Sequence, residues 1–230
     1  AFGIIFTLGY GGYTRTLFLR ALQAHGLPLH VLAGLGGWLT FTAMGVSHRL
    51  LAMFMLSPEL DGAPTRWTLR LGTLALAIVI IAGPVAIAAR GNPDLALLIA
   101  GLIGLACLAL YARDVVQLYR KRVRRVIELN SRMAGIALAH LAAATLLTIA
   151  LAALGLFGRY GGALVFLVCF GWLSGLGLAK LYKIVAFLTW LECYGPVLGK
   201  TPTPRVQDLV TEHRASKWFR LHFGAVWLGT

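Results

Sequence analysis

Acidic residues and cysteine are scarce in this sequence. Of 230 residues only eight are Asp or Glu and three are Cys, whereas 59% are hydrophobic and only 13% are charged. So many apolar side chains exceed what one soluble core of this length can enclose, which excludes a water-soluble globular domain. The odd number of cysteines, without CxxC spacing, also argues against a disulfide framework or a thiolate metal site.

Motifs of hydrolytic and nucleotide chemistry are absent as well. The sequence has no Walker loop, no HExxH, no GxSxG and no pair of carboxylates inside an apolar segment. Hydrolase and nucleotide-binding functions therefore have no support. All eight carboxylates are expected in loops or at helix ends, so coupled transport of protons or cations would lack its usual ligand inside the membrane.

Long apolar stretches dominate what is present. Several exceed the roughly 18 residues that mark a membrane-spanning helix. The sequence predicts an all-α, polytopic transmembrane bundle of six to seven spans, forming a single domain over residues 1–230. The chain opens and closes inside apolar runs, so we expect it to be a segment of a longer polypeptide. The predicted spans are 1–21, 29–56, 68–89, 94–112, 133–157 and 161–191, and a seventh would begin near 219.

The net charge of +13 is explained by membrane topology. Lys and Arg gather at the ends of apolar segments and form no stripe with interleaved aromatic residues, so nucleic acid is not expected as a partner. If the basic loop 113–132 is cytoplasmic, 17 of the 21 basic residues fall on that side and four on the other. We therefore expect a bacterial inner-membrane protein whose 113–132 loop and 192–220 segment are cytoplasmic. The basic run has an alternative role in binding anionic lipid headgroups.

Two of the predicted spans share one sequence template. Gly37, Trp38 and Leu39 recur 134 positions later as Gly171-Trp172-Leu173, and the parallel continues from Arg49 into Lys183. Both helices run in the same direction across the membrane, because an even number of crossings separates them. Such repeats occur in transporters and in helical redox proteins, so the repeat predicts architecture and leaves the chemistry open.

The second span carries glycine between two histidines. At 100° per residue one helical face holds His30, Gly34, Gly37, Phe41, Gly45, His48, Ala52 and Met55. Five turns, or about 27 Å, separate His30 from His48. Small residues there favour close helix packing. The alternative interpretation is that they make room for a haem whose iron takes an axial imidazole.

A haem with two histidine ligands needs a second imidazole, and His140 in the fifth span is the candidate partner of His48. Each lies about eight residues from the inner end of its helix, and hence at a similar depth. The alternative is that each histidine donates to a carbonyl or lines a helix contact. Tyr182 replaces His48 in the repeat, between Lys180 and Lys183, and is a candidate for binding a haem propionate. The default role of these lysines is to anchor the helix at the headgroups.

One stretch also resembles a known family. Leu27-Pro28-Leu29-His30, then Gly34, Gly37-Trp38-Leu39 and Gly45-Val46-Ser47-His48-Arg49-Leu50, resembles the second helix of haem-copper oxidase subunit I, particularly its cbb3 and nitric oxide reductase branch. The resemblance implies that His30 occupies the position of a ligand to a low-spin b-type haem. It covers about a quarter of the chain. The intramembrane HxxxHY and the adjacent His-His pair of those oxidases are missing, so reduction of oxygen or nitric oxide by this segment alone is not expected.

These observations lead to one expected function and one competing class. The expected function is b-type haem binding and electron transfer in the membrane, with His30, His48 and His140 as candidate iron ligands and with no catalytic centre of its own. Its partners would be the lipid bilayer, respiratory-complex subunits or a c-type cytochrome. The competing class is a non-redox membrane protein, either a scaffold or assembly factor of a respiratory complex or a small-solute permease.

Overall fold

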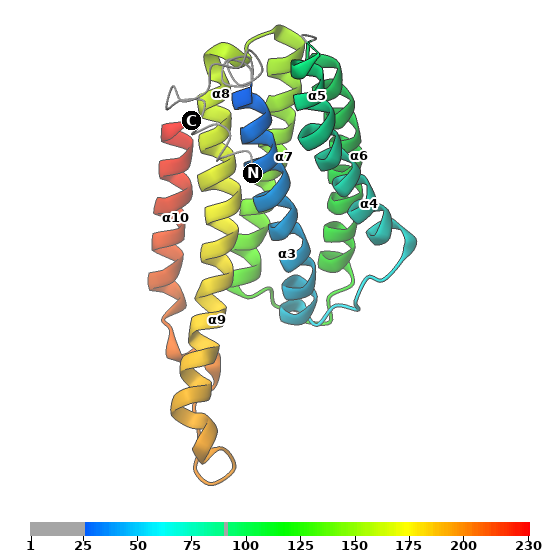
Figure 1. Ribbon diagram of the computed structural model, residues 1–230. Coiled ribbons are helices and arrows are strands. Elements are labelled where there is room, and N and C mark those ends of the chain that lie inside the picture. Colours follow the sequence, from blue (N-terminus) through cyan, green and yellow to red (C-terminus); the bar gives the residue numbers. More distant parts are fainter. Residues whose placement is uncertain (1–25, 90–91) are drawn as a thin grey trace, which may run out of the picture. The chain divides into compact units, whose positions relative to one another are not determined.

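Helices dominate the part of the chain that the structure, a computed structural model, describes: residues 26–89 and 92–230 (Figure 1). No strand occurs among these residues. Five helices are long and apolar enough to cross a membrane: Gly26–Met55, Ala63–Ala88, Asp94–Arg120, Leu129–Leu154 and Phe157–Val197. The protein is therefore a multi-pass helical membrane protein, which confirms the predicted fold class.

The helices differ most from the predicted spans at two boundaries, each by about two helical turns. Helix α6 (Asp94–Arg120) continues two turns beyond the predicted end at 112, because Val115 and Leu118 extend its buried face. The helix expected from 219 begins at Glu212 as α10 (Glu212–Gly229). Among the helices described, α10 is not one of the five apolar spans, since its first half is rich in charged residues. The predicted span 1–21 lies outside the described residues.

The chain divides into two compact units, Ala1–Arg122 and Val123–Thr230. The prediction of a single domain over residues 1–230 stays a prediction. In the first unit a helical turn at 26–31 leads into the π-helix η1 (Leu32–Leu39) and then α3 (Thr40–Met55). The helix that follows comprises α4 (Ala63–Ala77), η2 (Ile78–Ala82) and α5 (Gly83–Ala88), and α6 completes the unit.

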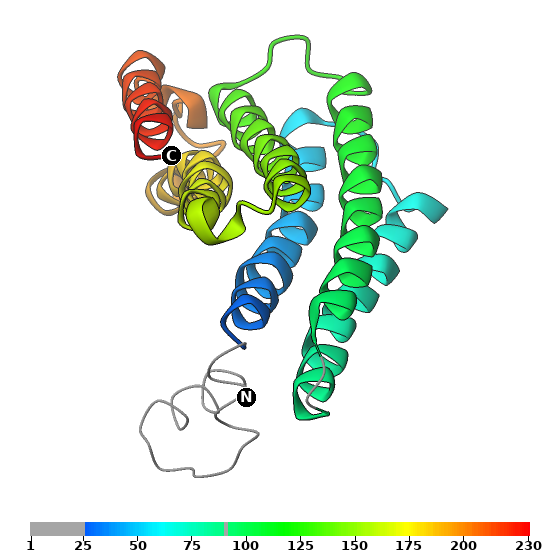
Figure 2. The ribbon, with the colours of Figure 1, turned by 90° about the horizontal axis from the view of Figure 1, so that it is seen from above.

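Helix contacts in the first unit form where a large side chain meets a glycine. α4 lies along α6 over most of its length (Figure 2). A Cβ at Gly72 of α4 would collide with the ring of Phe41, and one at Gly83 would lie 2.6 Å from Leu29 Cδ2. Leu29 is fully buried and belongs to a small core with Val79, Ile87 and Ala100. The glycines therefore set how closely these helices approach one another.

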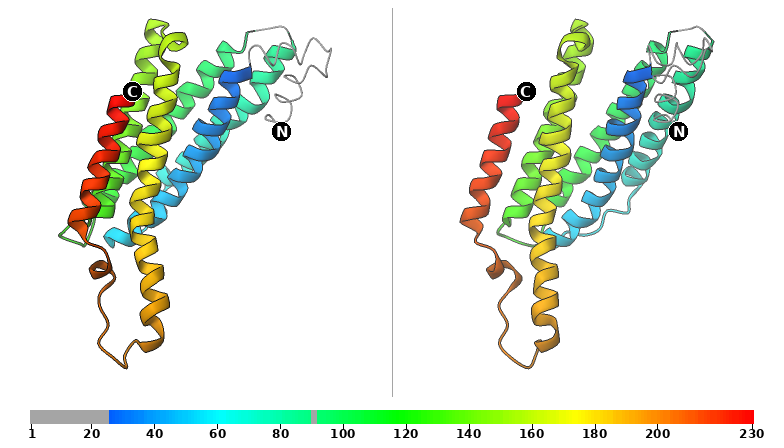
Figure 3. Two further views of the ribbon diagram at one scale, coloured as in Figure 1. Left: turned by 90° about the vertical axis from the view of Figure 1, so that its left-hand side faces the viewer. Right: turned by 60° about the vertical axis from the view of Figure 1, so that its left-hand side comes forward.

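The second unit is a bundle of three long helical segments. These are α7 (Leu129–Leu154), then α8 (Phe157–Phe166) continued by the π-helix η3 (Leu167–Ser174) and α9 (Gly175–Tyr194), and finally α10. α9 extends past the start of α7, and the chain returns to α10 through a loop with two short 3₁₀ turns, η4 (Gly195–Val197) and η5 (Val206–Leu209) (Figure 3). α10 packs mainly on η3, with further contacts to α7 and α8.

The sequence repeat corresponds to a repeat in backbone geometry. Gly37-Trp38-Leu39 lies in η1 and Gly171-Trp172-Leu173 in η3, and each of these π-helices is eight residues long. π-helices are rare, occur mostly as single turns and are frequent at functional sites. The surroundings are not repeated, because Trp172 is fully buried whereas Trp38 is 72% exposed. The repeat therefore preserves the backbone and changes what packs against it.

The π-helix alters the predicted face of the second span. A π-helix has more than 3.6 residues per turn, so the uniform step of 100° does not hold from His30 to His48. The buried residues of α3 are Thr40, Met44, Ser47, Leu51, Ala52 and Met55, whereas Gly45 is exposed and His48 is half-buried. The predicted single face joining His30 to His48 was therefore wrong, because η1 shifts the register between them.

Large apolar side chains cover the outer faces of both units. Leu98 and Leu102 of α6 are 59% and 60% exposed, and Leu146 and Leu154 of α7 are both 68% exposed. Soluble proteins rarely expose apolar surface on this scale. These faces are suited to contact with the lipid bilayer, where helices satisfy their backbone hydrogen bonds internally.

A strained residue ends α3. Leu56 is left-handed (φ 52°), and Ser57 N donates to Ala52 O at 2.9 Å. The same turn ends α7, but there the left-handed residue is Gly155 (φ 67°). A left-handed conformation costs a residue with a side chain about 1–2 kcal/mol. We predict that Leu56→Gly raises the free energy of unfolding by about 1 kcal/mol, measured by denaturant titration in mixed micelles.

The matched control is Gly155→Leu, which introduces the same strain at the equivalent turn and should lower stability by about 1–2 kcal/mol. Equal stability of wild type and both variants would contradict the assigned conformation of the two turns.

Candidate functional site

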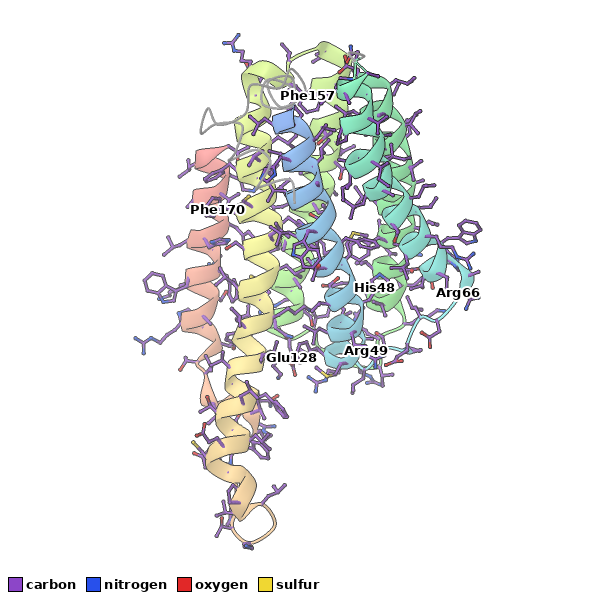
Figure 4. All side chains as sticks on the ribbon, in the orientation of Figure 1. His48, Arg49, Arg66, Glu128, Phe157 and Phe170 are labelled. Atoms are coloured by element: carbon purple, nitrogen blue, oxygen red, sulfur yellow. The ribbon has the colours of Figure 1, made fainter. Side chains whose placement is uncertain are left out.

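Both units bury polar side chains. In the first unit one polar group lies between α3, α4 and α6, and Figure 4 shows His48 on α3 within it. Ser47 Oγ donates to Met44 O at 2.8 Å and lies 2.5 Å from the Tyr111 hydroxyl. Because the Ser47 proton is committed to the carbonyl, Tyr111 donates to Ser47. The His48 ring lies 5.2 Å from the ring of Tyr111, centroid to centroid.

A buried carboxylate belongs to the same group. Asp114 is 2% exposed and accepts a hydrogen bond from Thr65 Oγ1 at 2.8 Å. It follows Tyr111 by one helical turn on α6 and interacts electrostatically with His48. The expectation that every carboxylate lies in a loop or at a helix end is therefore wrong for Asp114. It failed because α6 continues past residue 112 and buries the face on which Asp114 lies.

In the second unit one buried polar group centres on His140 of α7. His140 is 3% exposed, and its Nδ1 lies 2.8 Å from Ile136 O. A carbonyl oxygen only accepts, so Nδ1 carries a proton, and an imidazole with its single proton there has its lone pair on Nε2. Nε2 is buried and has no hydrogen-bond partner among the residues described.

Aromatic rings and a glycine surround this imidazole. Phe223 stacks on it at 5.1 Å and Trp227 lies at 5.2 Å, both from α10. On η3, a Cβ added at Gly171 would lie only 2.7 Å from His140 Cδ2. The glycine of the repeated Gly-Trp-Leu triplet therefore provides the space for the imidazole. At its counterpart Gly37 the space is filled by Leu76, so the interpretation that glycine in the second span allows close helix packing is confirmed at this position.

The glycine-bearing face predicted for the second span is open at two other positions, Gly34 and Gly45. No described atom lies within 4 Å of a Cβ built at Gly34 or at Gly45. His30 is exposed on the turn at 26–31, two residues before η1. The space beside these glycines is not filled by side chains of the described residues.

Tyr182 lies on α9 near the charged end of the second unit. It is half-buried, and its ring meets the edge of Phe219 at 6.1 Å. Its neighbour Lys183 forms an ion pair with Glu128 at 2.8 Å, and Arg124 pairs with the same carboxylate. Lys180 is 6% exposed. The default expectation of headgroup anchoring is therefore wrong for Lys180, which is buried, and stays a prediction for Lys183, which is ion-paired.

The candidate ligands belong to different units. His30 and His48 lie in the first unit and His140 in the second. The pairing of His48 with His140 across one haem stays a prediction. Among the described residues no three His, Cys, Asp or Glu side chains come together as metal ligands. Of the four methionines, Met44, Met55 and Met133 are buried core residues, whereas Met53 is 56% exposed.

Sequence reasoning missed the roles of Ser47, Thr65, Tyr111 and Asp114. A weak signal was present, since Tyr111 and Asp114 are three residues apart and would share one face of a longer helix. Comparison with family models, curated proteins and solved structures gives no match for this chain. Any proposed function must therefore be argued from these side chains.

The contact between Gly171 and His140 can be tested by adding one methyl group. We predict that Gly171→Ala destabilises the protein by about 1–3 kcal/mol, because the new Cβ overpacks the buried ring. The measurement is unfolding of the purified protein in mixed micelles.

The control is Gly177→Ala on the same helical segment, where nothing lies within 4 Å of an added Cβ. It should be neutral or stabilising by about 0.5–1 kcal/mol, since alanine favours helix. If both substitutions have the same effect, the close contact at Gly171 is refuted.

Proposed function

We propose that this chain is an integral membrane protein that binds a b-type haem and takes part in electron transfer, and that it is related to haem-copper oxidase subunit I but lacks an oxygen-reducing centre. We place it in a bacterial inner membrane with the 113–132 loop and the 192–220 segment in the cytoplasm. The resemblance around His30 and the basic residues at one end of the predicted topology support this proposal.

The observation that carries the proposal is the state of His140. A histidine that ligates iron through Nε2 usually donates from Nδ1 to a backbone carbonyl, which fixes the tautomer and orients the ring. His140 makes that hydrogen bond to Ile136 O, and its buried Nε2 has no partner among the described residues. An imidazole buried only for packing would leave this nitrogen unsatisfied at a cost of about 1–3 kcal/mol.

The donor set suits a haem better than a metal ion bound by protein alone. Haem iron needs only one or two axial ligands from the protein, and imidazole is the commonest of them. His140 would hold the iron, while the aromatic rings of Phe223 and Trp227 keep water from the ligand. When bound, haem supplies one-electron redox chemistry, which the side chains themselves lack. His30, His48 and Tyr182 remain the further candidates, the histidines as ligands and Tyr182 toward a propionate.

The proposal predicts a spectrum. Protein purified in detergent from cells with ample haem should show a Soret band and, after reduction with dithionite, sharp α and β bands. His140→Ala should remove the haem or change its spin state, because it removes the imidazole that would hold the iron. Parallel His30→Ala and His48→Ala variants identify any second ligand.

His213→Ala is the control, since His213 is exposed at the start of α10 and should leave the spectrum unchanged. A pyridine haemochrome assay counts haem per chain. A featureless wild-type spectrum would overturn the haem proposal and favour the scaffold, assembly-factor or permease alternatives.

A second candidate function, a proton-coupled small-solute permease, is favoured by one observation. Asp114 is a carboxylate buried inside an apolar helix, hydrogen-bonded to Thr65 and close enough to His48 to interact electrostatically. Ionisable groups inside membrane helices commonly mark proton or ion pathways. His48, Tyr111 and Ser47 extend the polar group across two helices.

This candidate predicts proton movement that depends on Asp114. Proteoliposomes containing a pH-sensitive dye should acidify under an imposed inside-negative potential. Asp114→Asn should abolish the signal, because the amide keeps an acceptor for Thr65 but does not exchange protons. Asp94→Asn, at the exposed start of α6, is the control. Equal acidification with wild type and Asp114→Asn would exclude Asp114 as a proton carrier.

A further inference from the structure

Two adjacent cavities lie in the second unit, near the end that carries Arg124, Arg125 and Arg132. One is a groove of about 570 Å³ between α9 and α10, and the other is a pocket of about 720 Å³ between the start of α7, α9 and the η5 turn. Tyr182, Ala186 and Val210 line both. One molecule can therefore occupy the two together, with a different part of it in each.

The groove is almost entirely apolar. Along α9 its wall extends from Leu178 to Thr189, about 16 Å at 1.5 Å per residue. Its opposite wall on α10 includes Phe219 and the exposed ring of Trp218. The length and chemistry of the groove match a fatty acyl chain, and tryptophan is enriched where membrane proteins meet headgroups.

The pocket, in contrast, is lined by charged groups that are mostly paired. Its cations are Arg124, Arg125, Arg132 and Lys183, and its carboxylates are Glu128, Asp208 and Glu212. Glu128 is paired with Arg124 and Lys183, and Glu212 with Arg132 at 2.7 Å.

Asp208 has its own partner outside the pocket wall. Arg205 Nε lies 3.2 Å from Asp208 Oδ2, and this hydrogen bond lowers the pKa of Asp208 below its ordinary value. Arg125 is then the one cation of the pocket without a carboxylate within 4 Å among the described residues. The pocket thus offers one guanidinium for an anion that the protein itself does not provide.

We propose that these two cavities bind one anionic phospholipid, with its phosphate at Arg125 in the charged pocket and an acyl chain in the groove between α9 and α10. Arginine favours phosphate because its planar fork donates two parallel hydrogen bonds. The adjoining apolar groove selects a lipid over a soluble anion, and the net positive charge of the pocket selects an anionic over a zwitterionic headgroup.

Native mass spectrometry of the full chain, exchanged into phosphatidylglycerol or phosphatidylcholine, tests the proposal. Wild type should retain phosphatidylglycerol in preference to phosphatidylcholine. Arg125→Ala should lower that retention about fivefold, the factor that corresponds to about 1 kcal/mol for one basic residue at a lipid surface. The matched control is Arg214→Ala, an exposed arginine at the same end of the unit that lines neither cavity, and it should retain lipid as wild type does.

A second pair of variants tests the groove. Val185→Trp fills the groove and should reduce retention, whereas Leu188→Trp, equally exposed on α9 but outside both cavities, should not. Equal retention of the two lipids, or equal loss from Arg125→Ala and Arg214→Ala, would overturn the proposal. So would thermal stabilisation of delipidated protein by inorganic phosphate equal to that by phosphatidylglycerol, since the ligand would then be a soluble anion.

Discussion

Close packing of large side chains against glycine is the constraint on which both units depend. Lipid tails are as apolar as leucine side chains, so the hydrophobic effect does not drive helices together inside a membrane. Helix association there relies on van der Waals contacts at short range. Phe41 fills the space at Gly72 in the first unit, and His140 fills the space at Gly171 in the second. The second unit has another such contact, in which Phe223 packs on Gly175. Position 175 corresponds to Phe41 in the repeat, so the repeat has an aromatic ring at one of the two positions and a glycine at the other.

These contacts also determine where polar groups are buried. His140 is enclosed because Gly171 admits its ring and α10 brings Phe223 and Trp227 over it. Asp114 is buried in the first unit, where α4 packs along α6 and Thr65 donates to its carboxylate. Burying a polar group without a hydrogen-bond partner costs free energy, so a buried group that lacks a partner needs an explanation that a hydrogen-bonded group does not. Asp114 is hydrogen-bonded within the protein, whereas His140 Nε2 has no hydrogen-bond partner among the described residues.

The π-helices connect this packing to the repeat. η1 and η3 place the same Gly-Trp-Leu triplet in the same unusual backbone, yet Trp172 is buried and Trp38 is exposed. A π-helix turns the residues after it relative to an α-helix, so it decides which side of α3 faces α6. Ser47 and Met44 are consequently buried, while Gly45 is left at the surface.

The sequence by itself determined the number and approximate positions of the membrane spans within residues 26–197, because hydropathy is a local property of the chain. It also showed that two of these spans share a sequence repeat. It also singled out His140, since an imidazole in an apolar run stands out. Only the tertiary structure decided that Gly171 receives that imidazole, that Asp114 is buried and that Lys183 pairs with Glu128. Each of these three features depends on which residues of separate helices come into contact. Those contacts are set by the angles at which the helices cross and by the shift in register that a π-helix introduces. The hydropathy of single residues does not encode either.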